Sequence, residues 1–298
     1  MPRAAVNGVE IEYEAFGAET NPAILLIMGF ASQLTRWPVE LCEELAGRGF
    51  FVIRYDNRDV GKSTSMDSLG LPDLRAVATG GAPAYTLGDM AADAAALLDH
   101  LGIARAHIVG ASMGGMIAQL VAHNHSEKTL SLTSIMSSTG NPALPGAREE
   151  VMAVLGTVAA PDDRQAIIDR GVRLAQLIGS PAHPEGDDAV RDRVVRDMQR
   201  GYNPGGMVRH MAAIIADGDR RERLRNIAAP TIVLHGLDDP LVPVDGGRDT
   251  AAHIAGAELI EVPGMGHDFP VALAPLFADA ICRAAARAES LAPPRGRR

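Results

Sequence analysis

Short, continuous apolar runs recur along the chain and constrain its fold more than any other feature. The runs are AILLIM from residue 23, FFVIRY from 50, AHIVG from 106, LSLTSIMS from 130, TIVLHG from 231 and AELIEV from 257. AILLIM and FFVIRY predict strands that are buried on both faces of a sheet, and the other four runs predict further strands. Helical patterns at 37–49, 87–101 and 113–125 separate the first four runs, and strands that alternate with helices pair in parallel through right-handed crossovers. The sequence therefore predicts an α/β fold with a mostly parallel, doubly wound sheet.

Local turn and cap signals add detail to this sheet. The Asn-Gly pair at 7–8 predicts a hairpin before the alternating segment VEIEYEAF at 9–16, so an antiparallel edge should open the fold. Thr86 is the expected N-cap of the helix that follows it, and Gly102 is expected just beyond the end of that helix. Residues 65–84 are rich in Gly, Pro and Asp without periodicity, which predicts a loop.

The alternation of strands and helices stops between residues 140 and 226. This segment is charged and interrupted by Pro and Gly, yet it shows helical periodicity, which indicates a helical cap inserted over the sheet. The predicted division is a core in two parts (1–139 and 227–290), a cap (140–226) and a disordered tail (291–298). Apolar residues on the cap helices are expected to pack the cap against the core more often than to line a pocket. These residues are Met152, Leu155, Ile167, Leu174, Leu177, Met207, Met211 and Ile214.

Composition excludes several classes of protein. A formal charge of −9 gives no electrostatic reason to bind nucleic acid or an anionic membrane, and the arginines from Arg220 to Arg225 are expected to form a solvated face. Cys42 and Cys282 lie far apart without metal-ligand spacing, so neither a disulfide framework nor a zinc site is indicated. The N-terminus lacks an apolar signal segment, and no run approaches the roughly 20 residues of a membrane span. We expect a soluble cytoplasmic protein, a monomer or homodimer, without nucleic-acid or membrane partners.

One short motif contains a candidate catalytic residue. Gly110-Ala111-Ser112-Met113-Gly114 matches G-x-S-x-G, and it lies after a predicted strand and before a predicted helix. In this context the motif is typical of a nucleophile elbow, a strained turn that exposes the serine hydroxyl. Ser112 is therefore the candidate nucleophile.

A serine hydroxyl needs a base within hydrogen-bond reach and a third group that orients the base. His267 lies in the glycine-rich loop VPGMGHDFP after the last predicted strand, where the chain can bring an imidazole over the carboxyl edge of the sheet. His235, which ends a strand, is a weaker candidate. Five other histidines are expected to be packing or surface residues, without metal-ligand spacing. These are His107, His123, His125, His183 and His210.

The acid and the oxyanion donors follow from the same edge of the sheet. HGLDDPLVP supplies Asp238 and Asp239 after a strand, and the residues alone leave the choice between the two open. Met113 N–H, at the start of the helix after Ser112, is a natural oxyanion donor. The second donor should come from the loop after AILLIM, and Phe30 N–H is the predicted one.

Together, IMGF, VIRYDNRDVGKS, HIVGASMGG, VLHGLDDPLVP and VPGMGH resemble the motif set of α/β-hydrolase-fold serine esterases. The likeness covers about residues 9–137 and 227–287, and it is strongest to the carboxylesterase branch that contains aclacinomycin methylesterase. The resemblance implies a catalytic triad of Ser112, Asp239 and His267. It also implies an oxyanion hole formed by the backbones of Phe30 and Met113, and no cofactor.

Two features depart from this pattern. Many relatives have His-Gly in the oxyanion loop, where this chain has Met28-Gly29. In DNRDVGKS, Asp59 stands where glycine is frequent in the superfamily. Asp56 and Arg58 in the same loop are expected to be structural, holding it near the oxyanion strand.

The sequence thus predicts a serine hydrolase that cleaves carboxylic esters of small to medium hydrophobic substrates through an acyl-enzyme. Hydrolysis of C–C bonds in ring-cleavage products is an alternative that uses similar residues. A non-catalytic homologue that binds a small ligand is another. A serine at position 112 argues against dehalogenase or epoxide hydrolase chemistry, because those reactions need a carboxylate nucleophile.

Overall fold

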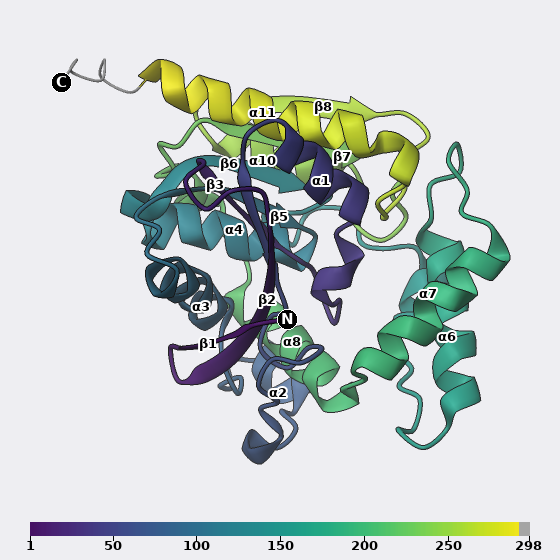
Figure 1. Cartoon of the computed structure of the whole chain (residues 1–298). Helices are drawn as coiled ribbons and strands as arrows, with labels where there is room; N and C mark the ends of the chain where they lie inside the picture. The colour runs from purple at the N-terminus through teal and green to yellow at the C-terminus, as the bar shows by residue number, and fades with distance from the viewer. Residues whose placement is uncertain (292–298) are drawn as a thin grey trace.

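The computed structural model describes residues 1–291 and contains an eight-stranded sheet with the order β1-β2-β4-β3-β5-β6-β7-β8 (Figure 1). The strands are β1 Arg3–Val6, β2 Val9–Phe16, β3 Ala23–Ile27, β4 Phe51–Tyr55, β5 Ala106–Ala111, β6 Thr129–Ile135, β7 Thr231–Gly236 and β8 Glu258–Val262. β1 and β2 form an antiparallel edge, and all pairs from β4 to β8 are parallel. The α/β class, the mostly parallel sheet and the antiparallel edge are confirmed.

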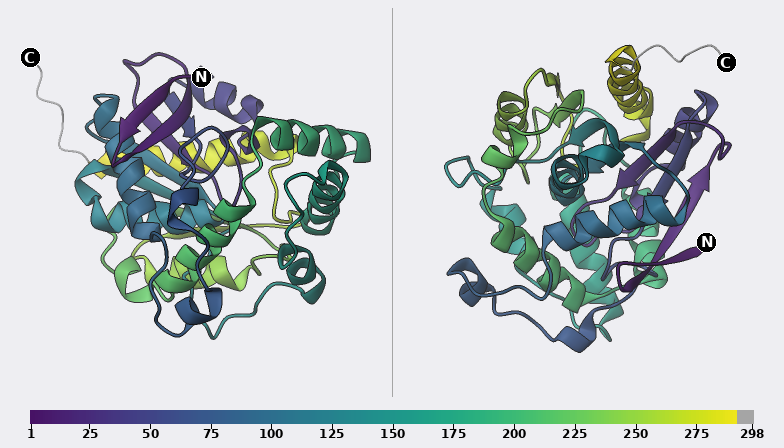
Figure 2. Two further views of the ribbon diagram at one scale, coloured as in Figure 1. Left: turned by 90° about the horizontal axis from the view of Figure 1, so that it is seen from below. Right: turned by 90° about the vertical axis from the view of Figure 1, so that its left-hand side faces the viewer.

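Helices cover both faces of the sheet (Figures 1 and 2). α1 (Val39–Gly47) and α11 (Ala274–Leu291) lie on one face, and α3 (Leu87–His100) and α4 (Met113–Asn124) lie on the other. The side chains of strand β3 pack against the helices on both faces of the sheet, because alternate side chains of a strand point to opposite faces. Ile24 and Leu26 belong to the core under α1 and α11, whereas Leu25 and Ile27 belong to the core under α3 and α4.

The predicted local signals are present. Asn7 and Gly8 both have positive φ, at 46° and 78°, as a tight hairpin requires. Thr86 caps α3 in a capping box with Asp89, and Gly102 follows the helix end with φ 69°.

The chain between β6 and β7 forms a helical insertion. Its helices are α5 Glu149–Leu155, α6 Arg164–Ile178, α7 Asp187–Arg200, α8 Pro204–Asp217 and α9 Arg221–Leu224. Figure 1 shows α6 and α7 side by side, away from the sheet, whereas α8 runs back along the core beside α2 (Leu74–Ala78). After β7, α10 (Asp245–His253) leads to β8. Short 3-10 helices occupy Leu34–Arg36, Asp67–Leu69, Ser126–Lys128 and Val271–Leu273.

Two sequence predictions were wrong. Residues 65–84 are not all loop, because α2 (Leu74–Ala78) forms there. It is too short to give a period, and the Asp73 side chain caps it by accepting hydrogen bonds from the backbone N–H groups of Arg75 and Ala76. Arg220 does not belong to a solvated face. It is 1% exposed, and its guanidinium donates to Gln119, Asp217 and the Ser138 carbonyl.

The predicted tail begins at Leu291, which is the last residue of α11, and residues 292–298 lie outside the described part. Within residues 1–291, no helix combines the length and apolar character needed to cross a membrane.

Candidate active site

Ser112 lies between β5 and α4 in a strained backbone conformation, with φ 56° and ψ −123°. Two close approaches explain the glycines around it. A Cβ atom on Gly110 would lie 2.1 Å from the Gly114 carbonyl oxygen, and one on Gly114 would lie 2.1 Å from the Ile27 carbonyl oxygen. The Ser112 N–H donates to the Ile135 carbonyl at 3.0 Å, which holds the turn against β6. The side chain is therefore presented at the carboxyl edge of the sheet, where β3 and β5 are neighbours.

The loop after β3 runs directly beside Ser112. A Cβ atom added to Gly29 would lie 3.0 Å from Ser112 Cβ and 3.5 Å from its Oγ. In the described residues, neither Phe30 N–H nor Met113 N–H donates a hydrogen bond to the protein. Each donor follows a residue of this close approach in the chain, because Phe30 comes after Gly29 and Met113 comes after Ser112.

Asp239 and His267 form a hydrogen-bonded pair at the same edge. His267 Nδ1 lies 2.6 Å from Asp239 Oδ2, and both residues are buried, at 8% and 6% exposure. The other carboxylate oxygen of Asp239 accepts the backbone N–H groups of Leu241 and Val242 at 2.9 and 2.8 Å. An ionised carboxylate only accepts, so His267 donates from Nδ1, and Nε2 is the nitrogen that is an acceptor in the neutral ring.

The electrostatics favour ionised Asp239. Burial raises its pKa, but the neighbouring His267 with its hydrogen bond, together with the nearby His235, outweighs burial and holds the pKa well below its usual range. His235 Nε2 donates to the Val242 carbonyl at 2.7 Å and lies 3.4 Å from Asp239 Oδ2. His235, the weaker histidine candidate, is thus a neighbour of Asp239.

Asp238, which the residues alone could not separate from Asp239, lies elsewhere. Its side chain is exposed, and it accepts the Gly264 N–H at 2.8 Å, which ties the loop after β7 to the loop after β8.

The structure does not join all three predicted side chains by hydrogen bonds. Among residues 1–291, Asp239 and His267 are bonded, but Ser112 Oγ makes no hydrogen bond to His267. The insertion also contacts the histidine loop, because His267 N–H donates to the Ile178 carbonyl at 2.7 Å and Gly266 N–H to Ser180 Oγ at 2.9 Å.

The loop after β4 holds the loop after β3 and the insertion to the core. Asp56 accepts the Leu34 N–H at 2.8 Å and Arg200 Nη1 at 2.6 Å. Arg58 forms two hydrogen bonds to Asp93, at 2.7 and 2.6 Å. These contacts agree with the structural roles predicted for Asp56 and Arg58.

Asp59, the unusual residue of this loop, binds α8. It adopts φ 67° and is 2% exposed. Its two oxygens accept Arg209 Nε and Nη2, each at 2.7 Å, and one also accepts the Tyr85 hydroxyl at 2.7 Å. Asp59 thus forms a buried ion pair with Arg209, which a glycine at position 59 could not form.

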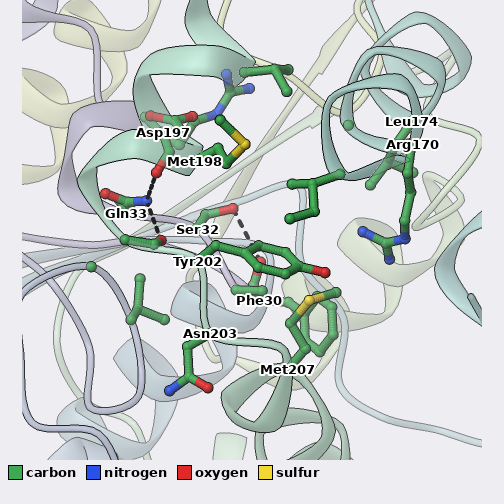
Figure 3. Close-up of a pocket in the computed structure, with 18 of the residues that line it drawn as sticks. Phe30, Ser32, Gln33, Arg170, Leu174, Asp197, Met198, Tyr202, Asn203 and Met207 are labelled. Carbon is green, nitrogen blue, oxygen red and sulfur yellow. Dashed lines mark hydrogen bonds between the residues drawn. The ribbon is translucent and has the colours of Figure 1, made fainter. Parts of the chain in front are cut away.

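A cavity of about 220 Å³ lies between the loop after β3 and the insertion (Figure 3). Phe30 and Gln33 line the cavity, and the Gln33 side chain donates to the Asp197 and Gly201 carbonyls at 2.6 and 2.8 Å. These bonds join the loop after β3 to α7 and to the residue that follows it. The apolar lining residues are Phe30, Ala31, Val60, Leu155, Ile167, Leu174, Ala175, Ile178, Val194, Met198 and Met207. Polar and charged side chains also line the cavity, and Figure 3 labels Arg170, Asp197 and Tyr202 among them. The other charged lining residues are Arg36, Asp59 and Arg193.

Four of the eight apolar residues singled out in the insertion line this cavity. These are Leu155, Ile167, Leu174 and Met207. Of the others, Ile214 packs against the core under α3 and α4, and Met152 is 49% exposed.

His210 is the site neighbour that sequence reasoning missed. The expectation of a packing or surface residue holds, because His210 is fully buried on α8. What the sequence did not indicate is its contact with Ala31, beside Phe30. No local signal could reveal this contact, because 179 positions separate the two residues in the chain.

Comparisons with known proteins agree with this architecture. The family model described as alpha/beta hydrolase fold matches residues 22–271. A rhodomycin D methylesterase of Streptomyces sp. (strain C5) is 30% identical, over 95% of this chain and 97% of that protein. A second, from Streptomyces peucetius, is 28% identical with the same coverage of both chains. The solved meta-cleavage product hydrolase of Pseudomonas fluorescens IP01 shares the fold, with a TM-score of 0.77, 19% identity, and 97% and 98% of the two chains covered. The chain therefore belongs to the α/β-hydrolase fold family.

Proposed function

We propose that this protein is a serine carboxylesterase that hydrolyses esters of small to medium hydrophobic substrates through an acyl-enzyme. Ser112 attacks the ester carbonyl while His267 Nε2 accepts its proton. His267 then protonates the departing alcohol, and a water molecule repeats the cycle on the acyl-enzyme. Asp239 holds the histidine in the Nδ1–H tautomer and stabilises its cationic form.

The backbone donors complete this mechanism. Phe30 N–H and Met113 N–H stabilise the oxyanion of each tetrahedral intermediate, and the positive end of α4 adds to the effect of Met113. Removing one such donor typically lowers kcat by about 10²–10³.

The observation that carries the proposal is the backbone of Ser112. A non-glycine residue with φ 56° and ψ −123° is strained, and such strain persists only where the surrounding structure enforces it. Here two glycines and a hydrogen bond to β6 enforce it, beside two free N–H donors. Display of a nucleophile explains all of these features together.

The insertion supports the choice of substrate. In the proposal it is the cap of the site, and its cavity of about 220 Å³ is below the roughly 300–1,000 Å³ typical of sites for drug-sized ligands. The cavity reaches Phe30 but is lined by neither Ser112 nor His267, and in the proposal its largely apolar lining accepts a hydrophobic group of small to medium size. The similarity to rhodomycin D methylesterases adds methyl esters to the substrates to be tested.

The test is a series of p-nitrophenyl esters of increasing acyl length, with methyl esters of aromatic acids measured beside them. We expect activity that rises to a medium acyl chain and then falls, and that is lost in Ser112→Ala. Leu174→Trp, which fills the cavity, should move the optimum to shorter chains, whereas Met152→Trp on the exposed side of α5 should not.

Two other outcomes would replace the proposal. Cleavage of vinylogous diketones without ester hydrolysis would favour a C–C bond hydrolase. A folded protein that binds these esters but turns over neither class would be a ligand-binding homologue.

A further inference from the structure

His210 connects the helical insertion to the loop that carries Phe30. The residue lies on α8, and its side chain is fully buried. Its Nδ1 accepts the Ala31 N–H at 3.2 Å, and its Nε2 lies 2.9 Å from the Arg58 carbonyl oxygen. An N–H can only donate and a carbonyl can only accept, so the ring is the neutral tautomer with its hydrogen on Nε2. Burial lowers the pKa of His210 to about 4, which keeps this form at neutral pH.

The Ala31 N–H needs such a partner. Ala31 has φ 50°, a left-handed conformation that is strained for a residue with a Cβ atom. This turn follows Phe30 directly, so a change at Ala31 would rotate the peptide that joins the two residues. The hydrogen bond to His210 opposes that rotation.

A second side chain holds the other end of the loop. Asn57 Nδ2 donates to the Met28 carbonyl at 2.8 Å. The peptide groups on both sides of the Gly29–Phe30 peptide are therefore held, one by Asn57 and one by His210. The peptide between them carries the Phe30 N–H, which donates to no protein group in the described residues. Both supports start from the loop after β4, because Asn57 belongs to it and Arg58 binds the His210 ring.

We propose that His210 is a positioning residue of the oxyanion hole, through which α8 sets the direction of the Phe30 N–H. This inference rests on the proposed function, because it takes Phe30 N–H as a donor to the oxyanion. Arg209, the preceding residue on α8, binds Asp59 and holds the helix in place. A misdirected donor stabilises the transition state less but leaves substrate binding nearly unchanged.

Two amide substitutions separate the two contacts of the ring. The amide of His210→Asn can occupy the Nδ1 position and accept the Ala31 N–H, but it cannot reach the Arg58 carbonyl. The longer side chain of His210→Gln reaches the Nε2 position and loses the Ala31 contact. We expect His210→Gln to lower kcat by about 10- to 100-fold, part of the effect of a lost donor, with KM within threefold. His210→Asn should retain kcat within about fivefold.

His107→Gln is the matched control. His107 is also buried, burial also lowers its pKa to about 4, and it lies at the start of β5, away from Ser112. It should lower stability without changing kcat. A trifluoromethyl ketone, which forms an oxyanion on the serine, gives a second readout, and its affinity should fall in parallel with kcat in His210→Gln. Thermal denaturation establishes which variants are folded, and if His210→Gln does not fold, the positioning role predicts that folded His210→Asn still binds the ketone within about fivefold of wild type.

The outcomes separate the two hypotheses. Wild-type protein without Ser112-dependent ester hydrolysis would overturn the proposed function and the role of His210 with it. If wild-type protein is active but His210→Gln keeps its kcat and ketone affinity, or KM rises as much as kcat falls, only the positioning role is wrong.

Discussion

Replacing Asp59 by glycine tests how the insertion is fastened to the core. Asp59 is 2% exposed and has φ 67°, so glycine would relieve backbone strain by about 1 kcal/mol. The same change removes the carboxylate that binds Arg209, a residue that is 1% exposed. Strain and ion pairing therefore predict opposite signs for this substitution.

The magnitudes decide the sign. Removing one partner of a buried pair costs about 3–5 kcal/mol, and Arg209 would keep only the exposed Asp67 as an acidic partner. After the strain relief, the expected loss is about 2–4 kcal/mol. Unfolding entropy near 2.1 cal/mol/K per residue over 298 residues converts this to a Tm lower by about 3–6 °C.

Scanning calorimetry of three variants measures the effect. Asp67 binds the same Arg209 but its side chain is 69% exposed, so Asp67→Asn should cost less than about 1 kcal/mol. Asp59→Gly combined with Arg209→Leu should recover part of the loss, because both charges leave together. An Asp59→Gly protein that melts at or above the wild-type temperature would refute the reasoning.

Three further predictions concern single groups. Asp239→Asn should lower kcat/KM by about 10³–10⁴ because the amide favours the wrong histidine tautomer, whereas exposed Asp238→Asn should stay within a fewfold; equal losses would contradict the assignment. Burial lowers the pKa of His107 to about 4, so the folded ring stays neutral, whereas the unfolded ring becomes protonated below about pH 6.5. The contribution of His107 to the stability of the folded protein is therefore complete above pH 6.5 and decreases as the pH falls. Urea unfolding should show the advantage of wild type over His107→Gln shrinking by about 2 kcal/mol between pH 8 and pH 5; a constant difference would count against burial of a neutral ring. Burial raises the pKa of Cys42 to about 12, so a thiol reagent should modify it only after denaturation, and rapid modification of Cys42 in native protein would show that the thiol is accessible.

Much of the fold could be predicted because its signals are local. Strands such as β3 are continuous apolar runs, and Thr86 and the Asn7-Gly8 turn act within a few residues. The short α2 could not be predicted, because five residues contain too little of a helical period.

Long-range contacts explain the other differences. Arg220 looked like part of an exposed basic cluster, but its partners include Gln119, about a hundred positions away. The contact of His210 with Ala31 likewise depends on how α8 packs on the core. At the site, motifs indicated Ser112 and His267, whereas the residues alone could not choose between Asp238 and Asp239.

Labelling with a fluorophosphonate, followed by peptide mass spectrometry, tests the central claim most directly. The reagent is expected to add once per folded molecule, on Ser112, and the reaction should slow by at least about 10³ in His267→Ala, because the base activates the hydroxyl. Folded wild-type protein that stays unlabelled, carries the adduct elsewhere, or reacts at the same rate without His267 would contradict the account.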